Sequence, residues 1–148
     1  MLAHIENLRE IAQRCTRGEP LGEDLSRWLS RSLDDFLAHR SRTLDDALGL
    51  KWPKGGVPWW LEEAMRRRDA ALRELAERFC ASQSICAQAR LIRTAAMRYA
   101  ASCWPIDRGR PEMPTGYGGR IHEWLWRAFK SGAPMPIGER QLRHVLAR

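Results

Sequence analysis

Apolar side chains recur at intervals of three and four residues along most of the chain, and this spacing limits the folds open to it. The spacing is typical of helices that bury one side, and no stretch shows the sustained alternation of a half-buried strand. Glycine and proline, which end helices, separate the helical runs. The pattern predicts an all-α protein, an irregular bundle of six or seven helices in a single domain.

The first fifty residues predict three helices with a mildly acidic balance of charge. Thr43 and Asp46 have the spacing of a capping box at the start of the third helix. The second helix carries a broad apolar face, formed by Leu25, Trp28, Leu29, Leu33, Phe36 and Leu37.

The later helical runs predict two pairs of helices. Residues 60–103 predict a basic antiparallel hairpin, and residues 120–148 a C-terminal pair in which Ile137 can pack on Leu142 as a hydrophobic staple. Residues 104–119 hold three prolines and four glycines, so they predict a long loop. The apolar positions of the hairpin are Leu61, Met65, Leu72, Leu75, Ala76 and Phe79 in its first helix and Ile85, Ile92, Ala96, Tyr99 and Cys103 in its second.

Size and composition favour a cytoplasmic protein. The chain has 148 residues and 44% apolar side chains, enough for one core. Its first ten residues lack the features of a secretory signal, and charges interrupt every apolar stretch before it could span a bilayer. The cysteines lack the spacing of a metal site, so we expect four reduced, largely buried thiols: Cys15, Cys80, Cys86 and Cys103.

Positive charge is concentrated in the second part of the chain. Residues 1–50 carry seven arginines against nine acids, whereas residues 51–148 carry eighteen basic residues against nine acids. No acid occurs between residues 78 and 106, where Arg90, Arg93 and Arg98 would span about 140° of one helix, opposite its apolar side. Two interpretations stay open: this face contacts a phosphate backbone, or acids of the first fifty residues cover it.

The seven tryptophans raise a similar choice, most clearly in KWPKGGVPWW at residues 51–60. The apolar stripes predict Trp28, Trp60 and Trp124 as core rings. Prolines and a glycine pair predict a connector in which either Trp52 or Trp59 stays partly exposed beside Lys51 and Lys54, at the edge of a binding surface. The alternative is a second packed layer that covers Trp52, Trp59 and Trp126.

The C-terminal pair also allows two interpretations. The spacing of Ala128 and Gly132 resembles a helix-turn-helix unit, with Arg140 and Arg143 on the outer side of the last helix. Two prolines lengthen the turn beyond that pattern, which favours a helix pair that completes the core.

Catalysis has little support in the sequence. Adjacent carboxylates such as Asp34 and Asp35 point to different sides of a helix, and the four histidines are scattered. The segment GYGG lacks the strand and the lysine of a phosphate-binding loop. We therefore predict no catalytic residue, no metal and no cofactor.

The segments GEPLGEDLSRWL, LDDALGLKWP, RRRDAALREL and LWRAFKSGAPMPIGERQLRHVL resemble uncharacterised helical proteins of proteobacterial prophages and integrative mobile elements. The resemblance implies a bacterial cytosol and a mobile-element setting, and it brings no catalytic residue. The sequence thus favours a small basic binding protein, with DNA or RNA narrowly ahead of a host protein as partner. The alternative is a protein–protein interaction module, or an inhibitor of a host protein or defence complex.

Overall fold

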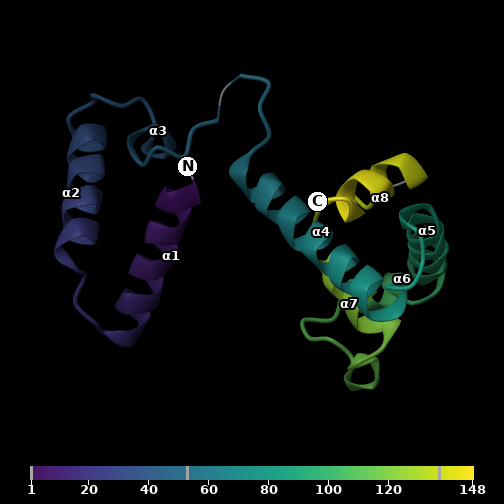
Figure 1. Ribbon diagram of the computed structural model, residues 1–148. Helices are drawn as coiled ribbons and strands as arrows, with labels where there is room; N and C mark the ends of the chain where they lie inside the picture. Colours follow the sequence, from purple (N-terminus) through teal and green to yellow (C-terminus); the bar gives the residue numbers. More distant parts are fainter. Residues whose placement is uncertain (1, 53, 137) are drawn as a thin grey trace. The chain divides into compact units, whose positions relative to one another are not determined.

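The computed structural model of the chain describes residues 2–52, 54–136 and 138–148 (Figure 1). In these ranges the regular structure is entirely helical, which confirms the all-α prediction. The described helices are α1 (Leu2–Arg17), α2 (Glu23–Leu37), α3 (Leu44–Ala47), α4 (Trp59–Phe79), α5 (Ile85–Ser102), α6 (Trp104–Asp107), α7 (Ile121–Lys130) and α8 (Glu139–Leu146), with a 3₁₀ turn at Thr115–Tyr117.

Seven of these helices match the seven helical runs of the sequence, and α6 is additional. The prediction that residues 104–119 form only a loop is therefore wrong at its start. Pro105 lies in the first turn of α6, where a missing backbone N–H costs no helical hydrogen bond. The predicted staple of Ile137 on Leu142 lies outside the described residues, as does Pro53 of the connector.

The chain divides into two compact units, Met1–Trp59 and Trp60–Arg148. Each unit has its own cluster of buried apolar side chains. The arrangement of the whole chain as a single domain stays a prediction.

The first unit has a small core where α1 meets the end of α3. Ile5, Leu48 and Leu50 are buried, and the half-buried rings of Trp28 and Trp59 pack against them. The second half of the apolar face of α2 departs from expectation, because Leu33, Phe36 and Leu37 are exposed. Helical periodicity gives the direction of a side chain and leaves open whether another element covers it.

The short helix α3 is held by the capping group that the sequence predicts. The side-chain oxygen of Thr43 accepts a hydrogen bond from the backbone N–H of Asp46 at 3.2 Å. Gly49 then ends the turn with a φ of +69°, a left-handed conformation that favours glycine.

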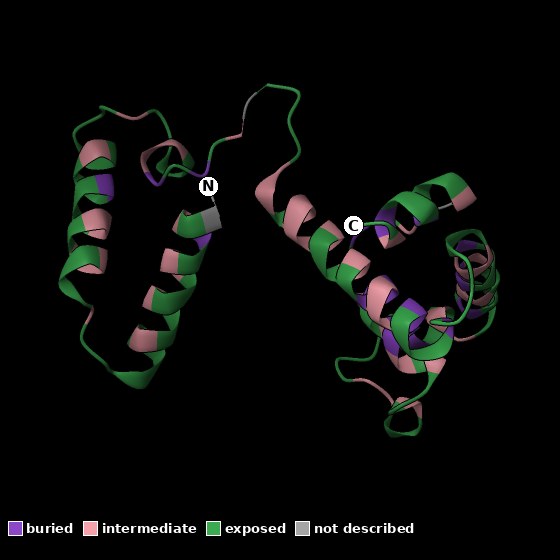
Figure 2. Ribbon diagram, viewed as in Figure 1, coloured by how far each residue is buried: buried purple, intermediate pink, exposed green. Residues whose placement is uncertain are grey.

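The second unit is built around one larger core, to which α4, α5, α7 and α8 contribute. Figure 2 shows the buried positions gathered where these helices face one another. Its fully buried large side chains are Tyr99, Leu72, Leu75, Ile92, Leu125 and Leu142. The C-terminal pair therefore completes this core, as the favoured interpretation of residues 120–148 states.

Helices α4 and α5 do not form the expected antiparallel hairpin. The backbone of α5 packs most extensively against α8, and Figure 1 shows α5 nearly end-on where α4 runs across the view. Phe79 and Ile85 flank the turn between α4 and α5, and both are exposed. Because α4 and α5 cross, residues near their shared turn lack a neighbouring helix to cover them.

A buried carboxylate holds the segment between α6 and α7 in place. The phenol groups of Tyr99 and Tyr117 both donate hydrogen bonds to Oδ2 of Asp107, each at 2.7 Å. Burial, and next the hydrogen bond to Asp107, raises the pKa of both phenols. Lys130 adds hydrogen bonds from its Nζ to the carbonyl oxygens of Arg108 and Arg110.

The cysteines differ in part from the prediction. All four thiols are free, but Cys15 and Cys86 are exposed, whereas Cys80 is buried and Cys103 half-buried. Burial raises the pKa of the Cys80 thiol. Across the described residues, no helix has the length and apolar character needed to cross a membrane.

Candidate functional site

The packing of α5 against α8 joins two basic segments that lie far apart in the sequence. Helix α5 carries three arginines and no acid, and α8 adds Arg140 and Arg143. We call the surface formed by these five arginines the α5–α8 face: Arg90, Arg93, Arg98, Arg140 and Arg143.

Two long contacts between side chains link α5 and α8 at this face. Nε of Arg90 lies 4.0 Å from Oε1 of Glu139, and Nη1 of Arg143 donates to Sγ of Cys86 at 3.9 Å. Arg90 follows Cys86 by one helical turn, and Glu139 precedes Arg143 by one turn. The basic side of α8 thus continues directly from the basic side of α5.

Exposure on α5 follows the predicted arc. Arg90 and Arg98 are exposed, Arg93 is half-buried, and the opposite residues Ile92 and Tyr99 are buried. In the described part of the chain Arg98 and Arg140 have no ion-pair partner, and Arg90 has only the long contact to Glu139. Within the described residues of the second unit, the charges of Arg98 and Arg140 are therefore not offset by an ion pair.

Helix α4 provides a contrast, because its charges neutralise one another within the helix. Arg66, Arg67 and Arg78 each contact the glutamate one turn earlier, at distances between 2.7 and 3.1 Å. Exposed pairs of this kind contribute little to stability, but they cancel charge locally. In contrast to α4, both α5 and α8 carry more basic than acidic side chains.

The predicted binding residues of the connector, Lys51, Trp52, Lys54 and Trp59, belong to the first unit. The predicted arginines belong to the second unit. Lys51 is exposed and its Nζ lies 3.4 Å from Oδ2 of Asp46. Lys54 is exposed, and Trp52 is half-buried. The structure therefore holds two separate sets of candidate residues, one in each unit.

The prediction of Trp60 as a core ring is wrong, whereas Trp52 and Trp59 are both half-buried, in agreement with the prediction that one of them stays partly exposed. Trp60, predicted as a core ring, is 52% exposed, whereas Trp59 packs on the core of the first unit. At about 100° per residue, Trp60 lies about 100° from Leu61 on α4, at the edge of the buried side. Two adjacent rings do point to different sides, as helical geometry requires.

Trp124 is buried, as predicted, and lies between two cations. The guanidinium groups of Arg78 and Arg127 lie 4.9 and 4.7 Å from the centre of its ring. Trp126, two residues later, is half-buried. Its ring packs against the core of the second unit and, with Trp124, lines a pocket beside α4.

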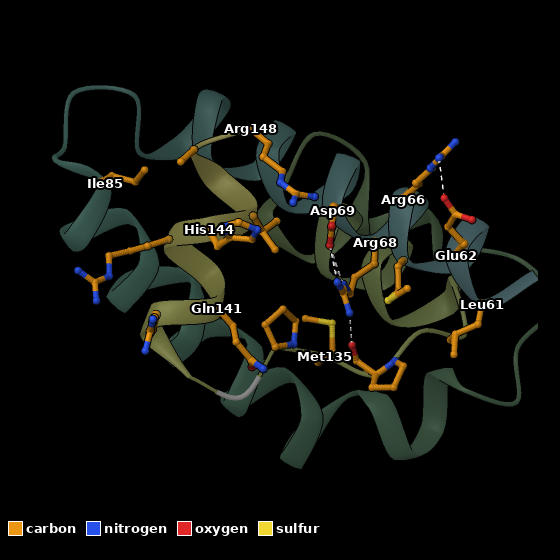
Figure 3. Close-up of a pocket in the computed structure, with 17 residues that line it drawn as sticks. Leu61, Glu62, Arg66, Arg68, Asp69, Ile85, Met135, Gln141, His144 and Arg148 are labelled. Atoms are coloured by element: carbon orange, nitrogen blue, oxygen red, sulfur yellow. Dashed lines mark hydrogen bonds and ion pairs between the residues drawn. The ribbon is translucent and has the colours of Figure 1, made fainter. Parts of the chain in front are cut away.

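A second feature of this unit is a groove of about 1190 Å³ between α4 and α8. Figure 3 shows the side chains of α8, among them Gln141 and His144, facing those of α4 across it. We call it the α4–α8 groove. Its apolar lining consists of Leu61, Met65, Ile85, Pro134, Met135, Pro136, Val145 and Ala147.

One ion pair lies in the lining of the groove, on the α4 side. Arg68 is largely buried and contacts Oδ1 of Asp69 at 2.6 Å through Nη2. Its Nη1 also donates to the carbonyl oxygen of Pro134, as Figure 3 shows. These contacts attach the 132–136 segment to α4 and so shape the groove.

The described residues offer no metal centre, since no group of three His, Cys, Asp or Glu side chains could hold an ion there. The most buried titratable cluster, Asp107 with Tyr99 and Tyr117, is a set of satisfied hydrogen bonds. The raised pKa values of both phenols extend their protonated, hydrogen-bond-donating form to more alkaline pH.

Comparison with family models, with curated proteins and with solved structures finds no match to this chain.

Sequence reasoning missed Glu139, Asp107 and the α4–α8 groove. The sequence marks Asp107 only as the acid that ends the acid-free run, ten residues before Tyr117, and its hydrogen bonds to the two phenols were not predicted. Glu139 and the groove have no such signal, because both depend on how α8 packs against helices far away in the sequence.

Proposed function

We propose that the protein binds nucleic acid through the α5–α8 face, without catalytic activity of its own. The observation that carries the proposal is the junction of an acid-free helix with a second basic helix. Three to five arginines on one exposed surface suit a phosphate backbone, because each contact releases a condensed counterion. Such contacts favour non-specific, salt-sensitive binding.

The setting that we propose is a bacterial cytoplasm, where the protein acts as an accessory or regulatory factor of a mobile element. The resemblance noted in the sequence supports this part of the proposal. Both DNA and RNA offer phosphates to this face, so both are candidate ligands.

Electrophoretic shift of duplex DNA and single-stranded RNA over a series of salt concentrations tests the proposal. With three to four phosphate contacts, the logarithm of the association constant should fall with the logarithm of salt with a slope of about −3. The double variant Arg90→Glu/Arg98→Glu should lose the shift at moderate salt.

The matched control is Arg66→Glu/Arg67→Glu, which changes the net charge by the same amount on α4. Absence of any shift at low salt, or equal weakening by both double variants, would contradict the assignment of nucleic-acid binding to the α5–α8 face.

A protein partner is the second candidate function, and the observation that favours it is the α4–α8 groove. Its apolar lining offers nothing to a phosphate backbone, whereas apolar side chains of a partner protein would be buried there.

A further inference from the structure

The α4–α8 groove combines an apolar floor with a cationic rim. Met65 and Met135 are half-buried and line it from α4 and from the 132–136 segment. Exposed apolar surface of this kind marks a binding site more often than isolated apolar residues do. An occupant must therefore present apolar side chains to the floor.

The charges around the groove are unequal. Its two acids, Glu62 and Asp69, are already paired with arginines at 2.7 and 2.6 Å. On the α8 side the basic residues Arg140 and Arg148 have no ion-pair partner in the described ranges, and Arg143 contacts only a cysteine sulfur. An occupant must therefore also present negative charge along the α8 side.

The size and the open shape of the groove favour a polypeptide over a small ligand. Pockets for small molecules measure about 300 to 1,000 Å³ and enclose most of the ligand, whereas this groove of about 1190 Å³ is bordered by two helices. Amphipathic helices dock into grooves of this kind with their apolar face inward. Methionine side chains adapt readily to such partners.

We propose that the α4–α8 groove binds an acidic amphipathic helix of a partner protein. Leucine or phenylalanine side chains of the partner would lie on Met65 and Met135, and its carboxylates would meet Arg140, Arg143 and Arg148. The proposal rests on the second candidate function, a protein partner, and does not require nucleic-acid binding.

Fluorescence polarisation with a labelled model peptide tests the proposal on the full chain. The probe is a helix of about five turns with leucine on one side and glutamate on the other, and the matched peptide carries lysine at each glutamate position. The acidic peptide should bind in the micromolar range, and the basic peptide at least about tenfold more weakly.

Variants of the groove locate the bound peptide. Met65→Glu should weaken binding at least about tenfold, because it places a repelling charge on the floor. Met97→Glu is the matched control, since Met97 is 60% exposed on α5 and does not line the groove. Arg148→Glu, at an exposed position, gives a second test that does not disturb the core.

Three results would overturn the proposal: equal binding of both peptides, unchanged binding by Met65→Glu and Arg148→Glu, or loss of binding in Arg90→Glu/Arg98→Glu alone. The last result would place the peptide on the α5–α8 face. Failure of the DNA shift with intact peptide binding would contradict only the proposed nucleic-acid function.

Discussion

Gly49 is a single residue on which the packing of the first unit depends. A β-carbon added there would lie 2.4 Å from Nδ1 of His4 and 2.7 Å from its Cε1. The His4 ring is therefore packed directly on the backbone at the end of α3, next to the buried Leu48 and Leu50.

Replacement of Gly49 by alanine should lower the free energy of unfolding by about 2 to 4 kcal/mol. About 1 to 2 kcal/mol of this comes from the left-handed backbone, and the rest from displacement of His4. Urea denaturation of the variant measures the loss.

Gly18→Ala is the control, because Gly18 has a φ of +67° and no atom within 4 Å of its added β-carbon. The loss in Gly49→Ala should exceed that in Gly18→Ala, and His4→Ala should remove the excess. Equal losses in the two glycine variants would show that His4 does not limit the site.

The two tyrosines of the chain, Tyr99 and Tyr117, predict an alkaline limit to stability. Their pKa values in the folded state are raised above the usual 10. The contribution of the two protonated phenols to the free energy of unfolding is therefore fully present below pH 10. Above it the unfolded chain releases phenol protons that the folded chain keeps, and the free energy of unfolding falls.

Tyrosinate absorbance during a pH titration measures this directly, since no other tyrosine contributes. Folded protein should show ionisation only well above pH 10, and protein in denaturant near 10. In Tyr117→Phe the fall in stability above pH 10 should be shallower. Ionisation of both phenols near 10 in the folded protein would contradict the buried network around Asp107.

At the scale of elements, α8 has a buried side that packs in the core and an exposed side that carries charge. Its buried residues Leu142 and Val145 complete the core, and its outer residues carry charge to the α5–α8 face. A helix of eight residues is too short to persist alone in water, so its basic side depends on its apolar side.

Leu142→Ala should therefore lower the free energy of unfolding by about 2 to 5 kcal/mol, as truncation of a buried leucine does. Leu91→Ala is the control, because Leu91 is 47% exposed on α5, and its effect should stay within about 0.5 kcal/mol. Thermal unfolding of both variants provides the comparison. Similar losses would show that α8 is not part of the core.

The sequence predicted elements better than the contacts between them. Capping by Thr43 and the arc of arginines on α5 follow from local spacing, and both are observed. Exposure of Leu37 and Trp60 could not be predicted, because periodicity cannot tell which helix, if any, lies opposite. The α4–α8 groove could not be predicted for the same reason. Met135 lies between two prolines in the sequence, which predicts a turn and does not indicate that α4 lies beside it.

At the scale of the whole molecule, charge divides along the two units. Residues 1–59 carry nine basic and nine acidic residues, whereas residues 60–148 carry sixteen against nine, a net charge of +7. All of the formal net charge thus belongs to the second unit, which also holds the α5–α8 face.

Brief digestion with trypsin should cut first after Lys54, which is exposed in a turn and followed by glycine. The fragment from residue 55 onward should bind a cation exchanger and retain the DNA shift with an unchanged salt slope. Mass spectrometry identifies the cut, and Lys54→Gln should slow it. A first cut within residues 108–110, or loss of the shift in the C-terminal fragment, would contradict this division.

The carboxylate of Asp107 also bears on how the length of this protein can vary. It accepts a hydrogen bond from Tyr117 and lies 3.6 Å from Nε of Arg110. The residues between Arg110 and Tyr117 therefore form a span that Asp107 holds at both ends. Closing such a span costs only about 0.6 kcal/mol more when its length doubles. Insertions should therefore be tolerated near the exposed Glu112, which makes this span a suitable place for a tag or a label.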